Sequence, residues 1–314
     1  MFKQQIYEVK NIMKKWLTGF ILLMLVFSLA ACGQTDDKAN DEKEGNKDTK
    51  SEEVFKIGAI PDQNAAFLQT GMEAVAKQLS EDTGMKVEFV PSVDYAALVT
   101  GFQRGEIHLA WFGGLTSVQA RNLVPEAESI VQRPRDAEFK SVFITQEGSG
   151  ISSLADLKGK SFTFGSESST SGHLMPRYFL TEEGIDPNTD FNGKPNFSGS
   201  HDTTYKLIES GSFQAGALNI SVWEAAVKEG KVDTNKVKVF YTTPDYFDYN
   251  WTINSNVEDV FGSDAKQKVK DSLLTMPGDS KEITDLFQTD MFIETKNENY
   301  EKIEKVAKEL EIIK

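Results

Sequence analysis

VFKIGAIPDQNAAFLQTGMEAVAKQLSEDTGMKVEFVPSVDYAALVTGFQRGEIHLAWF, residues 54–112, alternates short apolar runs with segments of helical spacing. Three of the runs predict β-strands because they are short and bounded by turn residues; they cover residues 54–60, 86–90 and 107–112. Between them, residues 67–79 and 95–105 place apolar side chains along one helix face, and Asp94 can cap the second helix. Strands and helices in this alternating order are typical of a parallel sheet with helical crossovers.

The same alternation restarts near residue 142, which predicts a second α/β unit. Strands are expected at 142–145, 161–164, 215–220, 237–241 and 251–254. Helices are expected at 154–159 and 172–180 and from residue 201, and the C-terminal tail is predicted to be helical over 265–276, 283–287 and 300–312.

Two α/β units in tandem predict two lobes with a ligand between them. We expect residues 54–143 plus 250–314 to form lobe I and residues 144–249 to form lobe II, with crossings near 142–145 and 249–253. Open α/β sheets bind ligands beyond the carboxyl ends of their strands. Facing lobes would place these ends around one cleft, which a hinge can close.

Residues 1–31 have the organisation of a signal peptide. Lys14 and Lys15 precede an apolar run over residues 17–31. This run is too short to span a bilayer comfortably, which takes about 20 apolar residues, and it fits the hydrophobic region of a signal peptide. Met13 offers an alternative start, because Met13-Lys14-Lys15 opens an ordinary positive region.

Cys32 directly follows the small residues Ala30 and Ala31, and it is the only cysteine of the chain. Small residues before a cysteine resemble the lipobox at which lipoproteins are cleaved and diacylated, so we expect Cys32 to be lipidated. The alternative is a plain secretory signal or membrane anchor with an incidental cysteine. Residues 32–53 are almost entirely polar and predict a disordered tether between lipid and domain.

The chain carries a net charge of −14, and removal of the basic segment 1–31 would make it more acidic. So acidic a surface argues against nucleic-acid binding and against membrane contact other than through the lipid anchor. An anionic ligand would therefore need local hydrogen-bond donors, since the whole-protein charge does not attract it. A single cysteine, used for lipid, leaves no disulfide for the mature chain.

Phe162-Thr-Phe-Gly-Ser-Glu-Ser-Ser-Thr-Ser-Gly-His-Leu-Met-Pro176 predicts a strand, a hydroxyl-rich loop and a helix start near Thr170. The first amides of a helix have no intrahelical partner, and the helix dipole makes this end suitable for an oxyanion. Ser169, Thr170 and Ser171 would add hydroxyl donors. The alternative is a serine-rich turn whose hydroxyls merely cap the helix.

Ser169-Thr-Ser-Gly172 with Pro176, placed after a strand, resembles the loop of phosphonate- and phosphite-binding proteins of ABC importers. Other matches follow in the same order as in that family: Asp94 to Leu98, Gly105 to Gly113, Gly199-Ser-His-Asp202 and Gly211 to Leu218. The resemblance covers roughly residues 55–290. It implies the two-lobed, type II fold of periplasmic binding proteins, a permease as partner, and no enzymatic activity.

The resemblance also implies which side chains line the site. Ser169, Thr170 and Ser171 would donate to the oxyanion, and His201, followed by Asp202, would approach it from the same lobe. The first lobe would contribute Tyr95, Trp111, Phe112, Asp62 and, at a helix start after two glycines, Thr116. We expect a monomer on the extracytoplasmic face of the cell membrane, with no cofactor.

Two departures from the family pattern bear on the ligand. Asn219 follows Leu218 near positions where relatives of the family that bind aminoalkylphosphonates have acidic residues, which favours an oxyanion without an amine. Residues 111–121 and 132–143 resemble a branch of the family assigned to selenate or sulfur-group oxyanions. The ligand is therefore expected to be a phosphonate, phosphite or phosphate, with selenate or sulfate as the alternative.

Several further groups allow two interpretations. We expect His108, inside an apolar strand, to be packed rather than ligating, and Arg133 and Arg135 to lie at the surface rather than in the cleft. The sequence leaves open whether His173 and Arg121 reach the cleft. Tyrosines and aspartates over 241–249 resemble those of iron-binding relatives, yet packing or cleft lining is the favoured interpretation, with residues 245–249 lining the cleft beside the hinge. Three scattered histidines do not make a metal site.

Two other functions share these features. A secreted hydrolase would use Ser169 with His201 as base, but the chain has neither a Gly-x-Ser-x-Gly elbow nor a P-loop. A ligand-loaded sensor that docks on a membrane receptor would use the same cleft, so the sequence alone does not separate it from an importer component.

Overall fold

The computed structural model describes residues 53–313. The expected signal peptide, the lipidation site Cys32 and all of the tether except Glu53 lie outside the described residues. No helix within the described part of the chain combines the length and apolarity needed to cross a bilayer.

The first sheet has the strand order β11-β4-β10-β3-β1-β2. Its strands are β1 (Phe55–Ala59), β2 (Val87–Phe89), β3 (Leu109–Phe112), β4 (Glu128–Gln132), β10 (Asn250–Ile253) and β11 (Ile293–Glu294). β1 pairs in parallel with β2 and β3, as the alternation of strands and helices predicted. β10 enters antiparallel between β3 and β4, so a segment from far along the chain completes this sheet.

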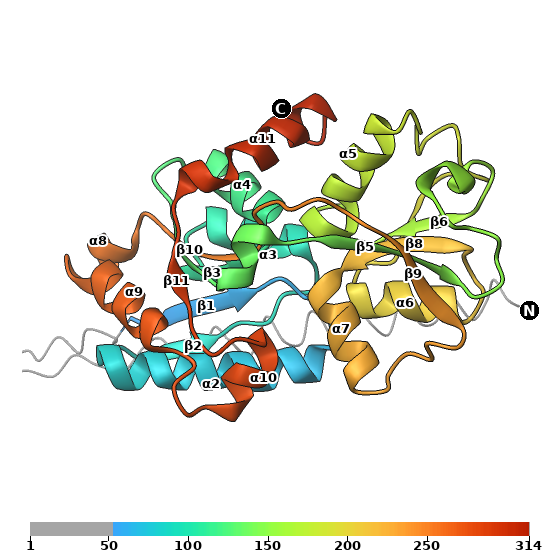
Figure 1. Cartoon of the computed structure of the whole chain (residues 1–314). Helices are drawn as coiled ribbons and strands as arrows, with labels where there is room; N and C mark the ends of the chain where they lie inside the picture. Colours follow the sequence, from blue (N-terminus) through green and yellow to red (C-terminus); the bar gives the residue numbers. More distant parts are fainter. Residues whose placement is uncertain (1–52, 314) are drawn as a thin grey trace, which may run out of the picture. The chain divides into compact units, whose positions relative to one another are not determined.

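Helices cover both faces of the first sheet (Figure 1). α2 (Ala65–Thr83) contacts α9 (Ala265–Thr275) and α10 (Lys281–Phe287), while α4 (Gly114–Leu123) contacts α3 (Tyr95–Gln103) and α11 (Glu301–Glu309). The short α8 (Val257–Phe261) leads into α9. The Asp94 carboxylate accepts a hydrogen bond from the amide of Ala97 at 2.7 Å, which confirms the predicted cap of α3.

The second sheet has the order β7-β6-β8-β5-β9. Its strands are β5 (Ser141–Gln146), β6 (Phe162–Phe164), β7 (Asn196–Phe197), β8 (Ala215–Asn219) and β9 (Val237–Thr242). β6 is parallel to β7 and β8, and β5 is antiparallel to β8 and β9. α5 (Met175–Glu182) lies on one face, and α6 (His201–Glu209) and α7 (Ile220–Lys228) lie on the other.

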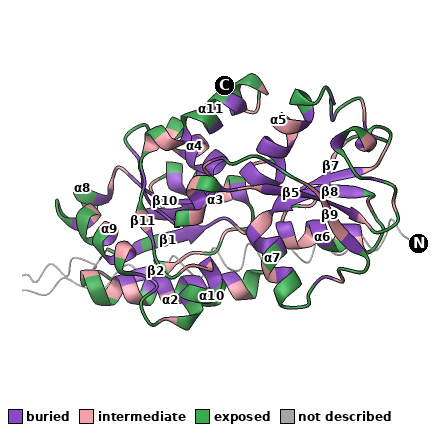
Figure 2. Ribbon diagram, viewed as in Figure 1, coloured by how far each residue is buried: buried purple, intermediate pink, exposed green. Residues whose placement is uncertain are grey.

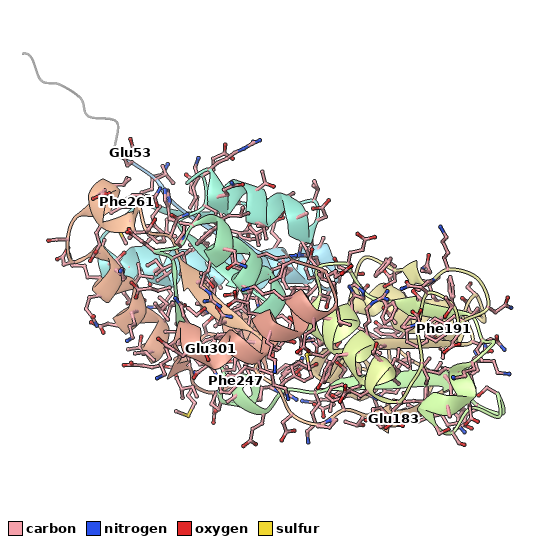
Figure 3. The ribbon with its side chains drawn as sticks, turned by 90° about the horizontal axis from the view of Figure 1, so that it is seen from above. Glu53, Glu183, Phe191, Phe247, Phe261 and Glu301 are labelled. Carbon is pink, nitrogen blue, oxygen red and sulfur yellow. The ribbon has the colours of Figure 1, made fainter. Side chains whose placement is uncertain are left out.

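Each sheet has its own hydrophobic core. The first is built around side chains such as Phe55, Trp251 and Phe287, and the second around Phe162 and Phe164 on one face and Ile144 and Leu218 on the other. Figure 2 shows the buried strands and the exposed outer faces of the helices. Viewed from above, Phe261 and Phe191 mark the far ends of the two lobes (Figure 3).

Two segments cross between the lobes, residues 133–140 and 243–249, and they run side by side. The amide of Phe139 donates to the Tyr246 carbonyl at 2.8 Å, and the amide of Tyr246 donates back at 3.0 Å. The sequence placed the crossings near 142–145 and 249–253. In the structure both crossings lie earlier in the chain than the sequence placed them. All of β5 already pairs in the second sheet, and all of β10 already pairs in the first.

Candidate functional site

The loop between β6 and α5 holds three buried hydroxyl side chains, those of Ser169, Thr170 and Ser171. The sequence predicted a helix start here, but Thr170–Leu174 forms a π-helical turn and α5 follows at Met175. The Ser169 hydroxyl caps this turn by accepting a hydrogen bond from the Gly172 amide at 2.9 Å. Single π-helical turns are frequent at functional sites, and the opening amides of such a turn lack intrahelical partners.

Gly172 is packed too tightly for any side chain. A Cβ added there would lie 2.9 Å from the Ser169 hydroxyl oxygen, 3.0 Å from Cε1 of His201 and 3.1 Å from the Cα of Gly165. The Gly165 amide also donates to the Gly172 carbonyl at 2.8 Å. The glycine therefore lets the loop close on itself while His201 packs against it.

The start of α4 in lobe I faces this loop of lobe II. The amide of Leu115 donates to the Thr170 hydroxyl oxygen at 2.9 Å, so Thr170 bridges the two lobes directly. A Cβ on Gly113 would lie only 3.1 Å from the same oxygen. Two helical N-terminal ends, each with a positive dipole end, thus meet between the lobes.

Asp248, from the second crossing, lies at the same point. Its Oδ1 accepts a hydrogen bond from the Gly114 amide at 2.9 Å. Burial raises the pKa of this carboxyl to about 7, although the hydrogen bond from the Gly114 amide acts in the opposite direction. Its acid–base equilibrium therefore lies close to neutral pH.

Three buried polar atoms of this region have no hydrogen-bond partner among the described residues: Asp248 Oδ2, the Ser171 hydroxyl and the Tyr95 hydroxyl. Burial raises the pKa of Tyr95 well above its ordinary value, and the nearby carboxyls of Asp62 and Asp248 add to this shift. Buried polar groups are normally paired. Unpaired groups from both lobes and from the crossing are what a polar ligand at this position would satisfy.

A second polar cluster adjoins the loop and joins both lobes through Tyr249. The Tyr249 hydroxyl donates to Asp62 Oδ2 at 2.8 Å and accepts from the Asn219 side-chain amide at 2.8 Å. His201 Nε2 lies 3.4 Å from the same hydroxyl, and His201 Nδ1 accepts from the Asn219 backbone amide at 3.3 Å. The His201 amide donates to the Asp62 carbonyl at 2.9 Å.

Burial sets the protonation of this second cluster. It raises the pKa of Asp62 to about 6, a shift opposed by the Tyr249 hydrogen bond and by the charge of Arg133. It lowers the pKa of His201 to about 3, so the imidazole is neutral at physiological pH. With its Nδ1 accepting a hydrogen bond, His201 carries its proton on Nε2 and is not free to act as a base for Ser169.

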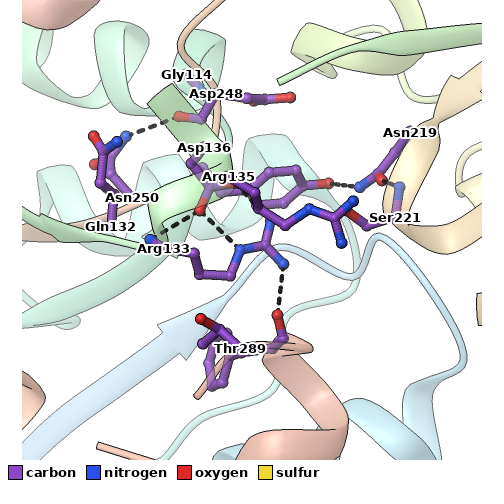
Figure 4. A network of polar contacts seen from close by, with 12 residues as sticks. Gly114, Gln132, Arg133, Arg135, Asp136, Asn219, Ser221, Asp248, Asn250 and Thr289 are labelled. Carbon is purple, nitrogen blue, oxygen red and sulfur yellow. Dashed lines mark hydrogen bonds and ion pairs between the residues drawn. The ribbon is translucent and has the colours of Figure 1, made fainter. Parts of the chain in front are cut away.

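Trp111 and Arg133 form a wall beside Asp62. The Trp111 ring stacks on Tyr249 with centroids 5.5 Å apart, and the Arg133 guanidinium lies 5.3 Å from the Trp111 centroid. Arg133 pairs with the buried Asp136, with Nη2 and Oδ1 2.6 Å apart (Figure 4). Figure 4 also shows Asn219 and Ser221 on the side of the second lobe.

Three of the expected site residues direct their polar groups or rings elsewhere. Phe112 packs edge-on against Phe102 in the core, with ring centroids 5.5 Å apart. The Thr116 hydroxyl donates to the Gly113 carbonyl within its own helix at 3.0 Å. The Asp202 carboxylate accepts from Ser200 and from Lys206, both at 2.7 Å.

The structure places the arginines and histidines whose position the sequence left open. Arg121 packs within lobe I, where its guanidinium lies 5.8 Å from the Tyr300 ring centroid. Arg133 is buried, so the expectation that it lies at the surface was wrong, whereas Arg135 is partly exposed and pairs with Glu224. His108 is packed, as expected, and its Nδ1 accepts from the Lys56 amide at 2.9 Å.

Asp248 and Tyr249 are the site residues whose roles the sequence did not assign. Residues 245–249 were expected to line the cleft beside the hinge, and the tyrosines at 241, 246 and 249 were expected to pack or line the cleft, although they also resembled metal ligands. In the structure they are separated: Tyr241 packs on Phe143, and the Tyr246 hydroxyl lies 2.6 Å from the Ser141 hydroxyl. The signal for Asp248 was its place just before the return strand β10, at a crossing between lobes.

Two α/β lobes, two adjacent crossings and buried polar groups facing each other between the lobes define a hinged substrate-binding protein. A family model described as "ABC transporter, phosphonate, periplasmic substrate-binding protein" matches residues 57–300. The chain belongs to this family, whose members bind and deliver a ligand rather than transform it.

Similar proteins agree with this assignment. The chain is 40% identical to the "Probable ABC transporter phosphite binding protein PhnD1" of Prochlorococcus marinus over 83% of its own length and 91% of the relative. A solved structure of that protein in complex with methylphosphonate covers 83% of this chain and 99% of its own, with a TM-score of 0.80. The "Phosphate-import protein PhnD" of Mycolicibacterium smegmatis is 28% identical over 82% of this chain and 84% of the relative.

Proposed function

We propose that this chain is a monomeric, lipid-anchored substrate-binding protein of an ABC importer on the extracytoplasmic face of the membrane. It captures a small tetrahedral oxyanion of the phosphonate, phosphite or phosphate class between its lobes. The observation that carries the proposal is the meeting of the loop at Ser169–Ser171 with the start of α4, joined by the Thr170 hydroxyl and the Leu115 amide 2.9 Å apart.

The donors at this meeting point suit an anion in an acidic protein. The loop offers hydroxyls and the opening amides of a helical turn, and lobe I adds the positive dipole end of α4 and the Tyr95 hydroxyl, which has no hydrogen-bond partner among the described residues. Such groups present partial positive charge without a lysine or arginine, because the helix dipoles point their positive ends at the ligand. A small oxyanion held by both lobes would stabilise the closed form by its differential affinity for it.

The Asp248 carboxyl favours a phosphorus oxyanion over sulfate or selenate. It lies beside the donor groups, and its pKa of about 7 makes it a hydrogen-bond acceptor when ionised and a donor when protonated. Phosphite, alkylphosphonates and phosphate retain an acid hydrogen near neutral pH and can share it with this carboxyl. Sulfate and selenate have no such hydrogen, so an ionised Asp248 would repel them.

The environment of Asn219 favours a ligand without an amine. Its Oδ1 accepts from the amides of Ser221 and Val222, at 2.6 and 3.1 Å, and caps α7. Its side-chain amide nitrogen donates to Tyr249. An ammonium group would need an uncommitted carboxylate here, but the Asp62 carboxyl is already hydrogen bonded by Tyr249 and faces the charge of Arg133.

The relatives support the same ligand class. PhnD1 of Prochlorococcus marinus is described as phosphite binding, and its solved structure contains methylphosphonate.

The lipid anchor at Cys32 is supported by the lipobox, and the permease partner is supported by the family. Replacement of Cys32 by Ala should release the protein from the membrane fraction; an unchanged membrane association would contradict lipidation at this residue.

A panel of anions tests the ligand class on residues 54–314. Thermal unfolding would be followed with phosphite, methylphosphonate, aminoethylphosphonate, phosphate, sulfate and selenate. We expect phosphite or methylphosphonate to raise the unfolding temperature in a saturable way, and aminoethylphosphonate, sulfate and selenate to have little effect. A shift with sulfate or selenate alone would contradict the phosphorus class, and no shift with any anion would contradict the whole proposal.

A further inference from the structure

His173 lies in the π-helical turn that carries Thr170 and Ser171. It is buried, with its Nδ1 2.7 Å from the Glu167 carbonyl oxygen. Its Nε2 accepts a hydrogen bond from Nε of Arg177 at 2.9 Å. Because an arginine nitrogen only donates, the proton of His173 must sit on Nδ1, where it donates to the Glu167 carbonyl.

Glu167, whose carbonyl accepts this bond, is exposed and lies in the turn of residues 166–168, which leads into Ser169; we call the loop of residues 165–171 the oxyanion loop. Ser166 and Ser168 have their own ties, since the Ser169 amide donates to the Ser166 carbonyl at 3.0 Å and the Ser168 amide donates to the Ser166 hydroxyl at 3.3 Å. Within residues 53–313, the bond to His173 is the one hydrogen bond that Glu167 makes. The imidazole therefore fastens the middle of the turn that leads into Ser169.

The His173 ring is itself held in a fixed orientation. It packs edge-on against Phe164, with centroids 5.0 Å apart, and against Phe197, with centroids 4.9 Å apart. The Arg177 guanidinium lies 5.2 Å from the Phe164 centroid, and its Nη1 donates to the Asn188 side chain at 3.3 Å. The ring thus connects the exposed side of the loop to the hydrophobic core of lobe II.

We infer that His173 is a positioning residue, which holds the loop of residues 166–168 so that the Ser169–Ser171 donors are already in place when the oxyanion arrives. This inference rests on the proposed function. If a loop becomes ordered only when the ligand binds, the free-energy cost of ordering it weakens the affinity. A loop that is already fixed in the ligand-free protein does not incur this cost during binding. His173 acts through Glu167 and the Ser169 cap, without contact to the ligand.

Three substitutions separate positioning from general packing. His173→Phe keeps a ring between Phe164 and Phe197 and removes both hydrogen bonds. His173→Asn places an amide near the position of Nδ1 and retains the bond to Glu167. His173→Gln places its side-chain amide near the position of Nε2, so it retains the hydrogen bond from Arg177 and loses the one to Glu167.

The matched control is His108→Phe in lobe I. His108 is also buried, its Nδ1 accepts a hydrogen bond from a backbone amide, and its ring packs against Phe55 and Phe261. It lies away from the oxyanion loop, so its replacement reports the cost of losing a buried histidine. We expect it to lower the unfolding temperature with the affinity for phosphite unchanged.

The readouts are calorimetric titration with phosphite and amide hydrogen exchange of residues 166–172 in the ligand-free protein. We expect about tenfold weaker binding and faster exchange for His173→Phe and His173→Gln, the size of effect that one lost hydrogen bond produces, and near wild-type values for His173→Asn. The inference is overturned if His173→Phe and His173→Gln bind phosphite as tightly as the wild type, or if His173→Asn is as weak as they are. Failure of the wild type to bind would instead remove the proposed function.

Discussion

Thr170→Val tests whether the two lobes close through the Thr170 hydroxyl. Valine preserves the shape of the side chain but leaves the Leu115 amide without the acceptor that it has at 2.9 Å. An unsatisfied buried amide costs about 1–3 kcal/mol. The substitution destabilises only the closed form, because water can solvate the Leu115 amide when the lobes separate. The dissociation constant for phosphite should therefore rise about 5- to 150-fold.

Two variants control this measurement. Thr170→Ser keeps the hydroxyl oxygen and should bind phosphite within about threefold of the wild type, well inside the cost of one lost hydrogen bond. Thr116→Val removes a buried hydroxyl that donates only to the Gly113 carbonyl of its own helix, and should leave the affinity unchanged. Calorimetric titration supplies the dissociation constants, and thermal unfolding without ligand shows that each variant is folded. If Thr170→Val binds as tightly as Thr170→Ser, the hydroxyl does not hold the closed form together.

Gly172→Ala should lower the free energy of unfolding by about 1–3 kcal/mol and weaken phosphite binding, because the new Cβ would lie 3.1 Å from the Cα of Gly165; wild-type urea unfolding would contradict this. Arg133→Met should cost about 3–5 kcal/mol in urea unfolding by leaving Asp136 buried without its partner, and adding Asp136→Leu should restore most of it; no recovery would contradict the pairing argument. Burial raises the pKa of Asp248 from 3.8 to about 7, so its contribution to stability is present below the lower value and is lost as the pH rises through the higher one. Asp248→Asn should therefore raise the unfolding temperature of the ligand-free protein at about pH 8 and have little effect at about pH 3.5, below both pKa values, and equal shifts at both would contradict it.

Local patterns were sufficient to predict the alternating part of the fold. The runs 54–60 and 107–112 became β1 and β3, and Asp94 caps α3 as expected. The short edge strands β7 and β11, with two residues each, carry too little apolar pattern to be recognised. The crossings were misplaced because a continuous apolar strand such as β5 gives no sign of which sheet it joins; only pairing with β8 and β9 decides this.

The candidate site was predictable in its loop but not in its partners. Hydroxyls after a strand predict Ser169–Ser171 as candidate donors, whereas the contact between Thr170 and Leu115 depends on how the lobes face each other. The role of Asp248 was missed for the same reason. Its carboxylate lies 2.9 Å from the Gly114 amide, but the two residues are 134 positions apart in the sequence. Arg133 was expected at the surface because an arginine is normally exposed, and here the burial of Asp136 beside it overrides that tendency.

A crystal structure of residues 54–314 grown with methylphosphonate tests the central claim most directly. We expect the phosphonate group between the loop at Ser169–Ser171 and the start of α4, with its oxygens about 3 Å from donors of both lobes. The Asp248 carboxyl should lie within hydrogen-bond distance of one of these oxygens. A methylphosphonate bound elsewhere, or held by one lobe alone, would contradict the proposed capture of an oxyanion between the lobes.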